Sequence, residues 1–567
     1  MAGARPVTTT MPAPRPNARP LARVTRVTRV TRVTRVARGT RLAHLTRVAH
    51  LTRVTRLARL ALLSLTGVLG ACTSAPAPAP GPVPAADPAP MTVRSAGTPP
   101  VNLGAVRTAG TTLQALVDSL VTLPQFGNAH WGILIVAPER GDTLASSGAD
   151  RLAMPASNQK LITGAVALAT LGPDFTWRTT FTGTGPVVNG ELRGDIVISG
   201  RGDPSISSAM RGDPLTAFDP LVAALRSAGV RRIAGRVRST DAWAFPGSPH
   251  GFGWDWDDLG EEYGAGVTEL MFNDGFAEVT VRGCGAAGTR ACLVTAPART
   301  APAMHAAVRI IEPGATGERL RWWRDSAATP GITIRGTIAR GDSLTFQVAQ
   351  PDLRVTYAAA VVEALQRAGI TVRGRVASTV RSDTLVVLTS RPLRDVLPAM
   401  QKPSQNQIAE ALYRTLALEV TGVGSSDSAR AVVERQLLAW GARPDGFAVR
   451  DGSGLSRHDY LTPRTIMQVL DTMRRSGTFA IYHDALPLAG VEGTLRNRLR
   501  GTAHGRVRAK TGTVDKARAL SGYVTTLDGE LLQFSMLTNN HSVSNREVDR
   551  VQDLIVERLL RLRRGER

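Results

Sequence analysis

The chain has 567 residues, 43% of them hydrophobic, so it is long enough to form several domains with cores of their own. Its net charge of +23 would suit a nucleic-acid-binding protein, but fourteen arginines and no acidic residue lie in residues 1–71, which leaves +9 of that +23 for the remainder. Three cysteines are too few for a small scaffold held together by disulfides. We therefore expect a multidomain protein with a basic leader and no nucleic-acid partner.

The leader, residues 1–72, combines a low-complexity basic tract with a secretory signal. Arg-Val-Thr repeats over residues 23–36, a pattern that forms no packed core. The tract is either an over-extended translation start, a long basic region removed with the signal, or a basic arm of the mature protein. Residues 57–71 add an apolar stretch that is too short to span a bilayer. Residues 69–72 read Leu-Gly-Ala-Cys, which resembles the bacterial lipoprotein box. The cysteine of that box, here Cys72, becomes the lipidated first residue of the mature chain.

The residues after the signal support export. A Pro/Ala-rich tether over residues 73–102 is typical of a chain lifted off a membrane. We expect an exported, periplasmic protein with a lipid anchor, although a plain signal peptide with a chance cysteine remains the alternative. Cys284 and Cys292 lie at the two ends of a Gly-rich loop between strand-like runs. Because an exported protein meets an oxidising environment, we expect these two cysteines to form a disulfide. The spacing of the cysteines resembles no zinc site, so we expect no metal.

The first candidate catalytic motif is S-x-x-K at Ser157 and Lys160. It follows a predicted helix over residues 113–123 and a predicted strand over residues 130–136. Good helix formers continue from Ser157 to the breaker at residues 172–173, which places the serine in the first turn of a buried helix. Lys160 then lies over the same face as the hydroxyl, and a desolvated, neutral amine can take the serine proton. Taken alone, the motif also fits an N-capping serine and a surface lysine.

The middle of the chain differs in pattern from both flanks. Residues 179–384 alternate short strand-like runs with glycine turns and are predicted to form inserted β-rich domains, two of them nested. They separate residues 103–178 from residues 385–567, which we expect to fold together as one split domain. A helix over residues 545–562 closes that domain, because apolar residues recur there on one helical face.

The second motif is S-x-N at Ser404 and Asn406, directly before an amphipathic helix. Pro403 is expected to keep the residue before it extended, so that Ser404 and Asn406 lie on a turn that projects their side chains into a cleft. Taken alone, this segment also fits a helix cap.

The third motif, K-T-G, begins at Lys510 within residues 506–514, where apolar and basic residues alternate as in a half-exposed strand. Further strands are predicted over residues 519–524 and 531–538. Gly512 is expected to let a substrate backbone come close.

Together and in this order, the three motifs are the set found in active-site-serine penicillin-binding proteins and β-lactamases. Ser404 follows Ser157 by 247 positions, too many for a compact β-lactamase-like domain without an insertion. Over roughly residues 105–560 the chain therefore resembles the D-alanyl-D-alanine carboxypeptidase/endopeptidase family, the DacB-type class C low-molecular-mass penicillin-binding proteins. Further stretches that resemble this family are Gly200–Pro204, Gly253–Asp258, Asp451–Arg457 and Gly490–Leu495.

The resemblance implies an α+β fold of the penicillin-binding-protein/β-lactamase-like transpeptidase type, in which helices flank an antiparallel sheet, here interrupted by the inserted domains. It implies a serine-type D-Ala-D-Ala carboxypeptidase and DD-endopeptidase that acts on peptidoglycan stem peptides and cross-links. β-Lactams would bind covalently as inhibitors, and no metal or organic cofactor is needed.

The resemblance also implies the catalytic roles. Ser157 would attack the carbonyl between two D-alanines, and Lys160 would take the hydroxyl proton to give an acyl-enzyme. Ser404 would relay the proton to the leaving amine, and Asn406 would hold the substrate amide. The backbone N–H groups of Ser157 and Thr513 would form the oxyanion hole.

The resemblance gives the remaining site residues a part in handling the substrate. Lys510 would lend positive charge, while Thr511 and Thr513 would meet the terminal carboxylate beside Gly512. Arg457 would bind the carboxylate on the side chain of a diaminopimelate-type stem peptide, because a guanidinium donates two parallel hydrogen bonds to a carboxylate. A surface ion pair is the alternative for Arg457.

Two other functions use the same features. A β-lactamase or esterase would share the residues but hydrolyse its acyl-enzyme fast, and the long insertion argues against it. A wall-binding module with a vestigial nucleophile is disfavoured, because a competent residue occupies every catalytic position.

Overall fold

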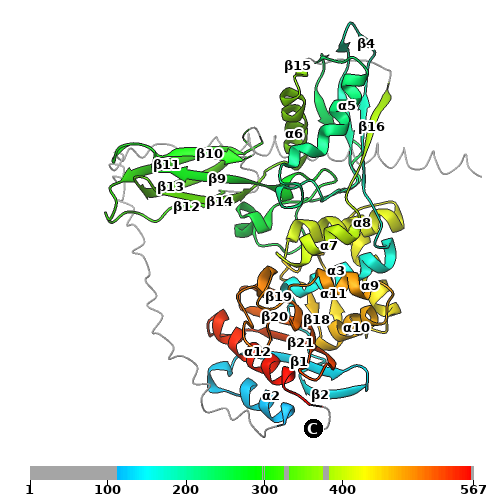
Figure 1. Ribbon diagram of the computed structural model, residues 1–567, viewed down its shortest axis with the longest axis vertical. Helices are drawn as coiled ribbons and strands as arrows, with labels where there is room; N and C mark the ends of the chain where they lie inside the picture. Colours follow the sequence, from blue (N-terminus) through cyan, green and yellow to red (C-terminus); the bar gives the residue numbers. More distant parts are fainter. Residues whose placement is uncertain (1–111, 297, 299, 325–330, 375–381, 564–567) are drawn as a thin grey trace, which may run out of the picture. The chain divides into compact units, whose positions relative to one another are not determined.

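The computed structural model describes residues 112–296, 298, 300–324, 331–374 and 382–563, all within one compact unit, Ser95–Arg567 (Figure 1). The predicted leader and tether, with Cys72, lie outside the described residues. Within the described ranges, none of the helices combines the length and the apolar character needed to cross a membrane.

A five-stranded antiparallel sheet in the order β19-β20-β21-β1-β2 joins the two ends of the described chain (Figure 1). Strand β1 pairs with β21 from His130 opposite Asn539 to Val136 opposite Gln533. The strands are β1 (His130–Ala137), β2 (Asp142–Ser147), β19 (Val507–Val514), β20 (Ala517–Thr525) and β21 (Leu531–Asn539). The predicted strands at 130–136, 519–524 and 531–538 are therefore confirmed, each slightly longer than expected.

One face of this sheet is covered by α2 (Leu113–Val121) and α12 (Asn545–Leu560), which share a core with sheet residues such as Leu520 and Met536. The predicted helices at 113–123 and 545–562 are confirmed, and each ends two residues earlier than expected. The residues of α12 that face this core are Val548, Val551, Ile555 and Leu559, all fully buried.

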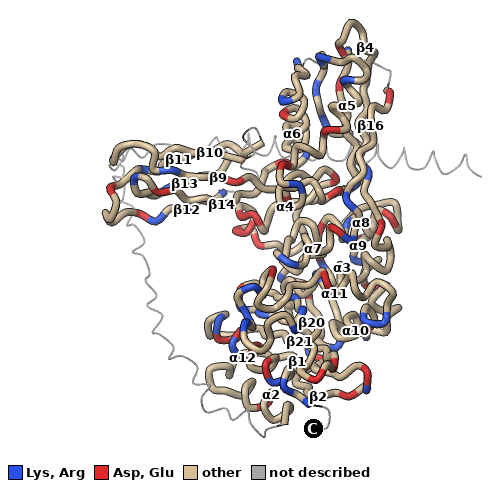
Figure 2. The backbone as a smooth tube through the Cα atoms, viewed as in Figure 1, with Lys and Arg blue, Asp and Glu red and all other residues tan. Residues whose placement is uncertain are grey.

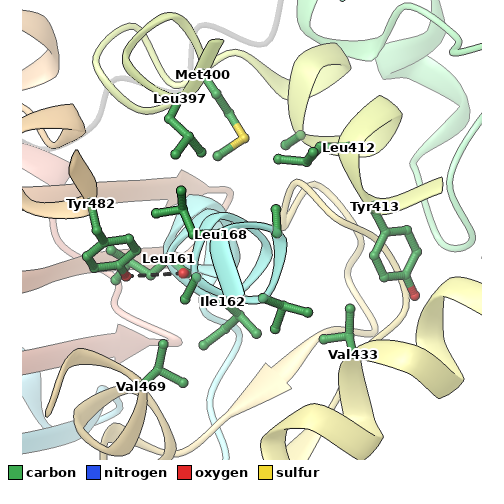
Figure 3. Packing of buried hydrophobic residues seen from close by; sticks show 14 of the residues in the cluster. Leu161, Ile162, Leu168, Leu397, Met400, Leu412, Tyr413, Val433, Val469 and Tyr482 are labelled. Carbon is green, nitrogen blue, oxygen red and sulfur yellow. Dashed lines mark hydrogen bonds between the residues drawn. The ribbon is translucent and has the colours of Figure 1, made fainter. Parts of the chain in front are cut away.

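The other face is covered by helices that surround α3 (Gln159–Leu171), as Figure 3 shows. Leu161, Ile162 and Leu168 of α3 are buried against side chains from all of these helices. The surrounding helices are α7 (Leu393–Gln401), α8 (Asn406–Thr421), α9 (Ser426–Ala439), α10 (Pro463–Arg474) and α11 (Phe479–Ala485). Because α3 is buried from Gln159 to Leu168, the residues at its N-terminal end are held in place by packing.

The chain between β3 and β16 forms two small sheets, in the orders β16-β3-β6-β8 and β15-β7-β5-β4, with their own core. This part also contains α5 (Asp219–Ser227) and α6 (Leu353–Arg367), which the alternating pattern of the sequence did not predict. Both helices bury apolar side chains in that core. The strands are β3 (Arg178–Gly183), β4 (Val187–Val188), β5 (Glu191–Leu192), β6 (Ile196–Ser199), β7 (Arg232–Ile233), β8 (Val237–Ser239), β15 (Thr371–Val372) and β16 (Asp383–Thr389).

Between α5 and α6 in the chain, six strands form two further three-stranded sheets around a separate core. The predicted disulfide is present here, between Cys284 just after β9 and Cys292 at the start of β10, with Cα atoms 5.9 Å apart. The strands are β9 (Phe276–Arg282), β10 (Cys292–Ala296), β11 (Ala303–Ile311), β12 (Arg321–Trp323), β13 (Gly331–Ala339) and β14 (Ser343–Ala349).

Basic and acidic residues are interspersed along the described chain (Figure 2). Many of them pair, and the pairs tie elements together: Arg498 and Arg518 both bind Asp549 of α12, at 2.8 and 2.6 Å. These pairs hold α12 to the sheet.

Candidate active site

Ser157 lies in a 3-10 turn, Ala156–Asn158 (η3), that leads directly into α3. Ala156 has a φ of +46°, a left-handed conformation that is strained for a residue with a side chain and that often marks a functional site. The Lys160 Nζ atom lies 2.9 Å from Ser157 Oγ. Lys160 is fully buried and α3 begins without a side-chain cap, so the structure has neither the N-capping serine nor the surface lysine that the motif alone allowed.

The Lys160 amine has two further oxygen neighbours besides the serine hydroxyl. They are Asn406 Oδ1 at 2.6 Å, from the start of α8, and the backbone oxygen of Ser453 at 2.7 Å. Both are carbonyl oxygens, which accept hydrogen bonds and cannot donate them. The S-x-x-K and S-x-N motifs therefore meet on one nitrogen atom.

Burial lowers the pKa of the Lys160 amine to about 7, although the nearby Asp451 and Asp459 carboxyls act in the opposite direction. About half of the amine groups are then neutral at pH 7 and carry a lone pair. A neutral amine has two N–H bonds, which the two carbonyl oxygens accept, and the lone pair is left for the hydroxyl of Ser157. This arrangement suits Lys160 to act as a general base.

Ser404 lies in the turn before α8 with a φ of +70°. Its Oγ accepts a hydrogen bond of 2.8 Å from Lys510 Nζ, so the second and third motifs also meet. The side chain that caps α8 belongs to Gln405, which accepts from Gln407 N–H at 3.1 Å. Ser404 itself is thus not the helix cap that the isolated segment suggested.

The expected extended conformation before Pro403 is wrong. Lys402 has helical angles, φ −65° and ψ −53°, and its N–H donates to Pro398 O at 3.0 Å. Its own carbonyl accepts a hydrogen bond of 3.0 Å from Thr494 N–H, a contact across 92 positions of the chain. These bonds outweigh the local preference against helical angles before proline, and the sharp turn falls at Ser404 instead.

Lys510 lies on β19, fully buried. Burial and the charge of Lys160 lower the pKa of Lys510 well below its usual value. The Asn158 side chain donates to Lys510 O at 2.9 Å and so ties β19 to the turn that carries Ser157. A Cβ at Gly512 would lie 2.7 Å from the chain's own Pro155 O, so the fold itself requires a glycine there, and the close approach of a substrate backbone stays a prediction.

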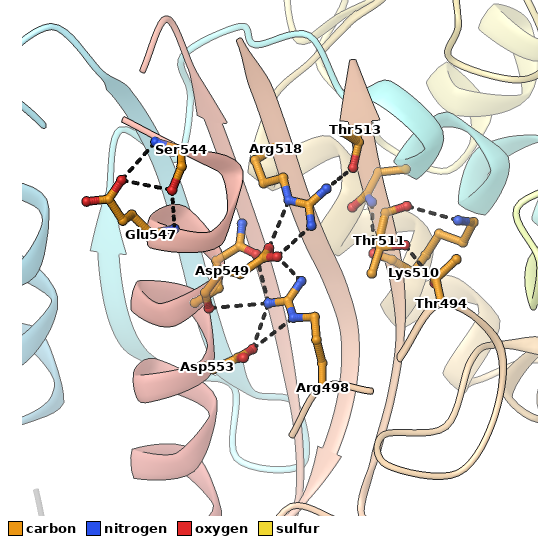
Figure 4. Close-up of polar contacts among 12 residues, drawn as sticks. Thr494, Arg498, Lys510, Thr511, Thr513, Arg518, Ser544, Glu547, Asp549 and Asp553 are labelled. Carbon is orange, nitrogen blue, oxygen red and sulfur yellow. Dashed lines mark hydrogen bonds and ion pairs between the residues drawn. The ribbon is translucent and has the colours of Figure 1, made fainter. Parts of the chain in front are cut away.

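The two threonines of β19 are held by neighbouring side chains, as Figure 4 shows. Thr511 Oγ1 donates to Thr494 Oγ1 at 2.7 Å. Thr513 lies opposite Arg518 on β20 and accepts a hydrogen bond from its guanidinium, which also binds Asp549. β19 is the edge strand of the sheet, and Leu488 pairs with Arg508 near its start. An extended peptide would have to pair with β19 beyond that point.

Arg457 lies between an inserted segment and the turn after β19. Its Nε atom is 2.9 Å from Asp255 Oδ2, and its Nη1 donates to Asp515 O at 3.1 Å. The side chain is 29% exposed. The ion pair considered as the alternative is present, and recognition of the stem peptide by Arg457 stays a prediction.

Sequence reasoning gave no role to Asp451, which organises the loop that presents the Ser453 carbonyl. The buried Asp451 carboxylate accepts from Ser453 N–H at 3.0 Å and from Gly454 N–H at 2.6 Å. Burial raises the pKa of Asp459 well above its usual value, whereas hydrogen bonds, including one from Asp459, lower that of Asp451 despite burial. The Asp-Gly-Ser-Gly turn was the sequence signal available.

Comparison with known proteins identifies the family. The sequence profile of the D-Ala-D-Ala carboxypeptidase 3 (S13) family matches residues 113–562. The chain belongs to this family. It is 31% identical over 474 residues to a D-alanyl-D-alanine carboxypeptidase of an Actinomadura species. The matched region covers 80% of this chain and 85% of that relative. It is 26% identical to the D-alanyl-D-alanine carboxypeptidase DacB of Haemophilus influenzae, over 76% of this chain and 89% of that protein.

A solved structure confirms the predicted fold class for this S13-family protein. Penicillin-binding protein 4 (DacB) of Haemophilus influenzae superposes with a TM-score of 0.66 at 23% identity, over 79% of this chain and 99% of that chain. A second structure of the same protein, in complex with a β-lactam, gives a TM-score of 0.62. The α+β fold of the penicillin-binding-protein type is therefore shown.

Proposed function

We propose that this S13-family protein is a serine-type D-Ala-D-Ala carboxypeptidase and DD-endopeptidase that works through an acyl-enzyme and is inhibited covalently by β-lactams. The observation that carries the proposal is the contact of the buried Lys160 amine with Ser157 Oγ at 2.9 Å, with two carbonyl oxygens on its other side. The family and its relatives named as D-alanyl-D-alanine carboxypeptidases support the substrate.

In the proposed reaction, Ser157 Oγ attacks the carbonyl carbon between two D-alanines while Lys160 takes the hydroxyl proton. The tetrahedral oxyanion is stabilised by the backbone N–H groups of Ser157 and Thr513. The C–N bond then breaks, and the proton that Lys160 took is relayed to the departing amine through Ser404, which accepts a hydrogen bond from Lys510, so that Lys160 is neutral again. Water attacks the ester, Ser157 recovers its proton, and the shortened peptide is released.

Substrate binding follows from the same site. A terminal carboxylate beside Lys510 would favour the ammonium form, which burial alone disfavours. The hydroxyls of Thr511 and Thr513 lie on the same edge strand and would complete the carboxylate site. The side-chain amide of Asn406 would hold the substrate amide.

Digestion of defined muropeptides tests the proposal directly. Incubation of the purified protein with monomeric pentapeptide and with cross-linked dimers should release D-alanine from the first and monomers from the second, as read by mass spectrometry. Release of D-alanine without cleavage of dimers would remove the endopeptidase part. Rapid turnover of penicillin with neither product would favour the β-lactamase alternative instead.

Arg457→Ala tests the proposed recognition of the stem peptide. Losing a hydrogen bond to a charged group costs roughly 1.5–3 kcal/mol, so kcat/KM should fall about tenfold to hundredfold on peptides with a diaminopimelate-type side-chain carboxylate. Penicillin acylation should stay nearly unchanged, because penicillin lacks that group. Steady-state kinetics with both substrates measures the difference.

Two further variants test whether Arg457 binds the peptide or only supports the structure of the cleft. Asp255→Ala breaks the ion pair of Arg457 but leaves the guanidinium in place, so it should keep more peptide activity than Arg457→Ala. Arg443→Ala removes an exposed arginine that pairs only with exposed aspartates and serves as the matched control. An equal loss on peptide and penicillin in Arg457→Ala would show that Arg457 supports the cleft and does not read the peptide.

We further propose that the protein is exported to the periplasm and anchored to a membrane by lipid on Cys72. The support is the sequence of the leader, since these residues lie outside the described structure. Mass spectrometry of membrane-extracted protein should show a mature chain that starts at Cys72 and carries added acyl mass. A soluble mature protein with an unmodified Cys72 would refute the anchor without affecting the enzymatic proposal.

A further inference from the structure

The side-chain amide of Asn406 can serve Lys160 in one orientation only. Its Oδ1 must face Lys160 Nζ, because its Nδ2 is a donor and would repel an N–H. The orientation is fixed by the carbonyl oxygen of Tyr263, which accepts from Nδ2 at 2.9 Å. Tyr263 belongs to the inserted part of the chain, which therefore decides which atom of Asn406 meets the amine.

Gln407, the next residue of α8, holds this inserted backbone in place. Its Nε2 donates to Glu262 O at 2.9 Å and to Ala265 O at 3.1 Å, on either side of Tyr263. Gln407 is fully buried, so water cannot replace these bonds without opening the contact.

The same inserted segment also supports the second acceptor of the Lys160 amine. Trp254 Nε1 donates to Asp451 Oδ2 at 2.7 Å, and Trp254 is only 9% exposed. The same Asp451 carboxylate binds the N–H and hydroxyl of Ser453, at 3.0 and 2.8 Å. The carbonyl of Ser453 is thereby directed at Lys160, 2.7 Å away.

We propose that the insertion positions the general base through Trp254 and the backbone of residues 262–265, and that Trp254 and Gln407 are positioning residues of the reaction. Each end of the segment fixes one of the two carbonyl oxygens that accept the N–H bonds of Lys160. With both fixed, the lone pair of the amine points at Ser157; with either one loose, the amine can rotate away. The insertion is then a working part of the acylation machinery in addition to any role in binding the substrate.

The inference rests on the proposed roles of Ser157 and Lys160, and acylation by a fluorescent penicillin tests it. Stopped-flow measurements separate K, the dissociation constant of the initial complex, from k2, the rate constant of acylation. Trp254→Phe keeps the ring but loses the N–H donor, and Gln407→Met keeps the approximate shape but loses both donors. Each should lower k2 about tenfold to hundredfold and leave K within about twofold, because both side chains are buried and bind protein atoms.

Trp256→Phe is the matched control, since Trp256 lies in the same segment but is 78% exposed, and its k2 should equal that of the wild type. An unchanged k2 in both positioning variants would overturn the inference. A raised K with unchanged k2 would do so too, because the insertion would then serve binding alone. If one variant fails to fold, judged by near-ultraviolet circular dichroism, the other still decides, since the two residues act from opposite ends of the segment. Absence of acylation in the wild-type protein would instead refute the proposed function.

Discussion

Ser157→Ala is expected to take no covalent label from a fluorescent penicillin, whereas the wild-type protein is labelled in a one-to-one ratio. A β-lactam presents its strained amide where the D-Ala-D-Ala bond would lie, and without the hydroxyl no ester can form. Gel fluorescence and the intact mass of the protein both measure the adduct.

A serine elsewhere in the same domain provides the control. Ser476, beyond the end of α10, donates to Met473 O at 2.7 Å and has no part in the proposed site, so Ser476→Ala should label like the wild type. Undiminished labelling of Ser157→Ala would show that another residue is the nucleophile.

Lys160→Ala is expected to slow acylation by several orders of magnitude, because removing one partner of an activated nucleophile removes most of the catalytic unit. Lys160→Arg should not restore the rate, since a guanidinium stays protonated and has no lone pair to offer. Stopped-flow acylation measures both variants. A rate close to that of the wild type in either would contradict the role of Lys160 as the base.

The same residue predicts the pH dependence of the wild type. The pKa of Lys160 is lowered to about 7, and only the neutral amine can accept the proton. As pH falls below that value, the rate of acylation should fall about tenfold per pH unit; above it, the rate should level off. A flat profile between about pH 5 and 9 would rule out an amine with this pKa as the base.

The sequence predicted best those features that depend on local spacing. The contact between Ser157 and Lys160 spans three residues at a helix start, and the apolar face of α12 follows helical periodicity, so both could be read from the chain. The fold class and the disulfide were also predicted correctly.

Features that depend on distant contacts could not be predicted in the same way. The carbonyl of Ser453 lies 293 positions from Lys160, and nothing local shows that the two meet. The prediction of an extended Lys402 was wrong, because a hydrogen bond from Thr494 overrides the preference set by the neighbouring proline. The helices α5 and α6 were missed because short strands and glycine turns dominate the pattern around them.

The pairing of β1 with β21 sets the order in which this chain can fold. Strand β1 occupies residues 130–137, and its partner β21 occupies residues 531–539. The central sheet therefore cannot close until the chain has been synthesised as far as β21. Strands β9 to β14, by contrast, have a core and a disulfide of their own and need no later segment for either. Pairings between distant segments form slowly, because the intervening loop must be closed before the contact is gained. The S-x-x-K motif therefore meets the K-T-G motif of β19 only at the end of folding, after the insertion that separates S-x-x-K from S-x-N has had time to become a structured unit.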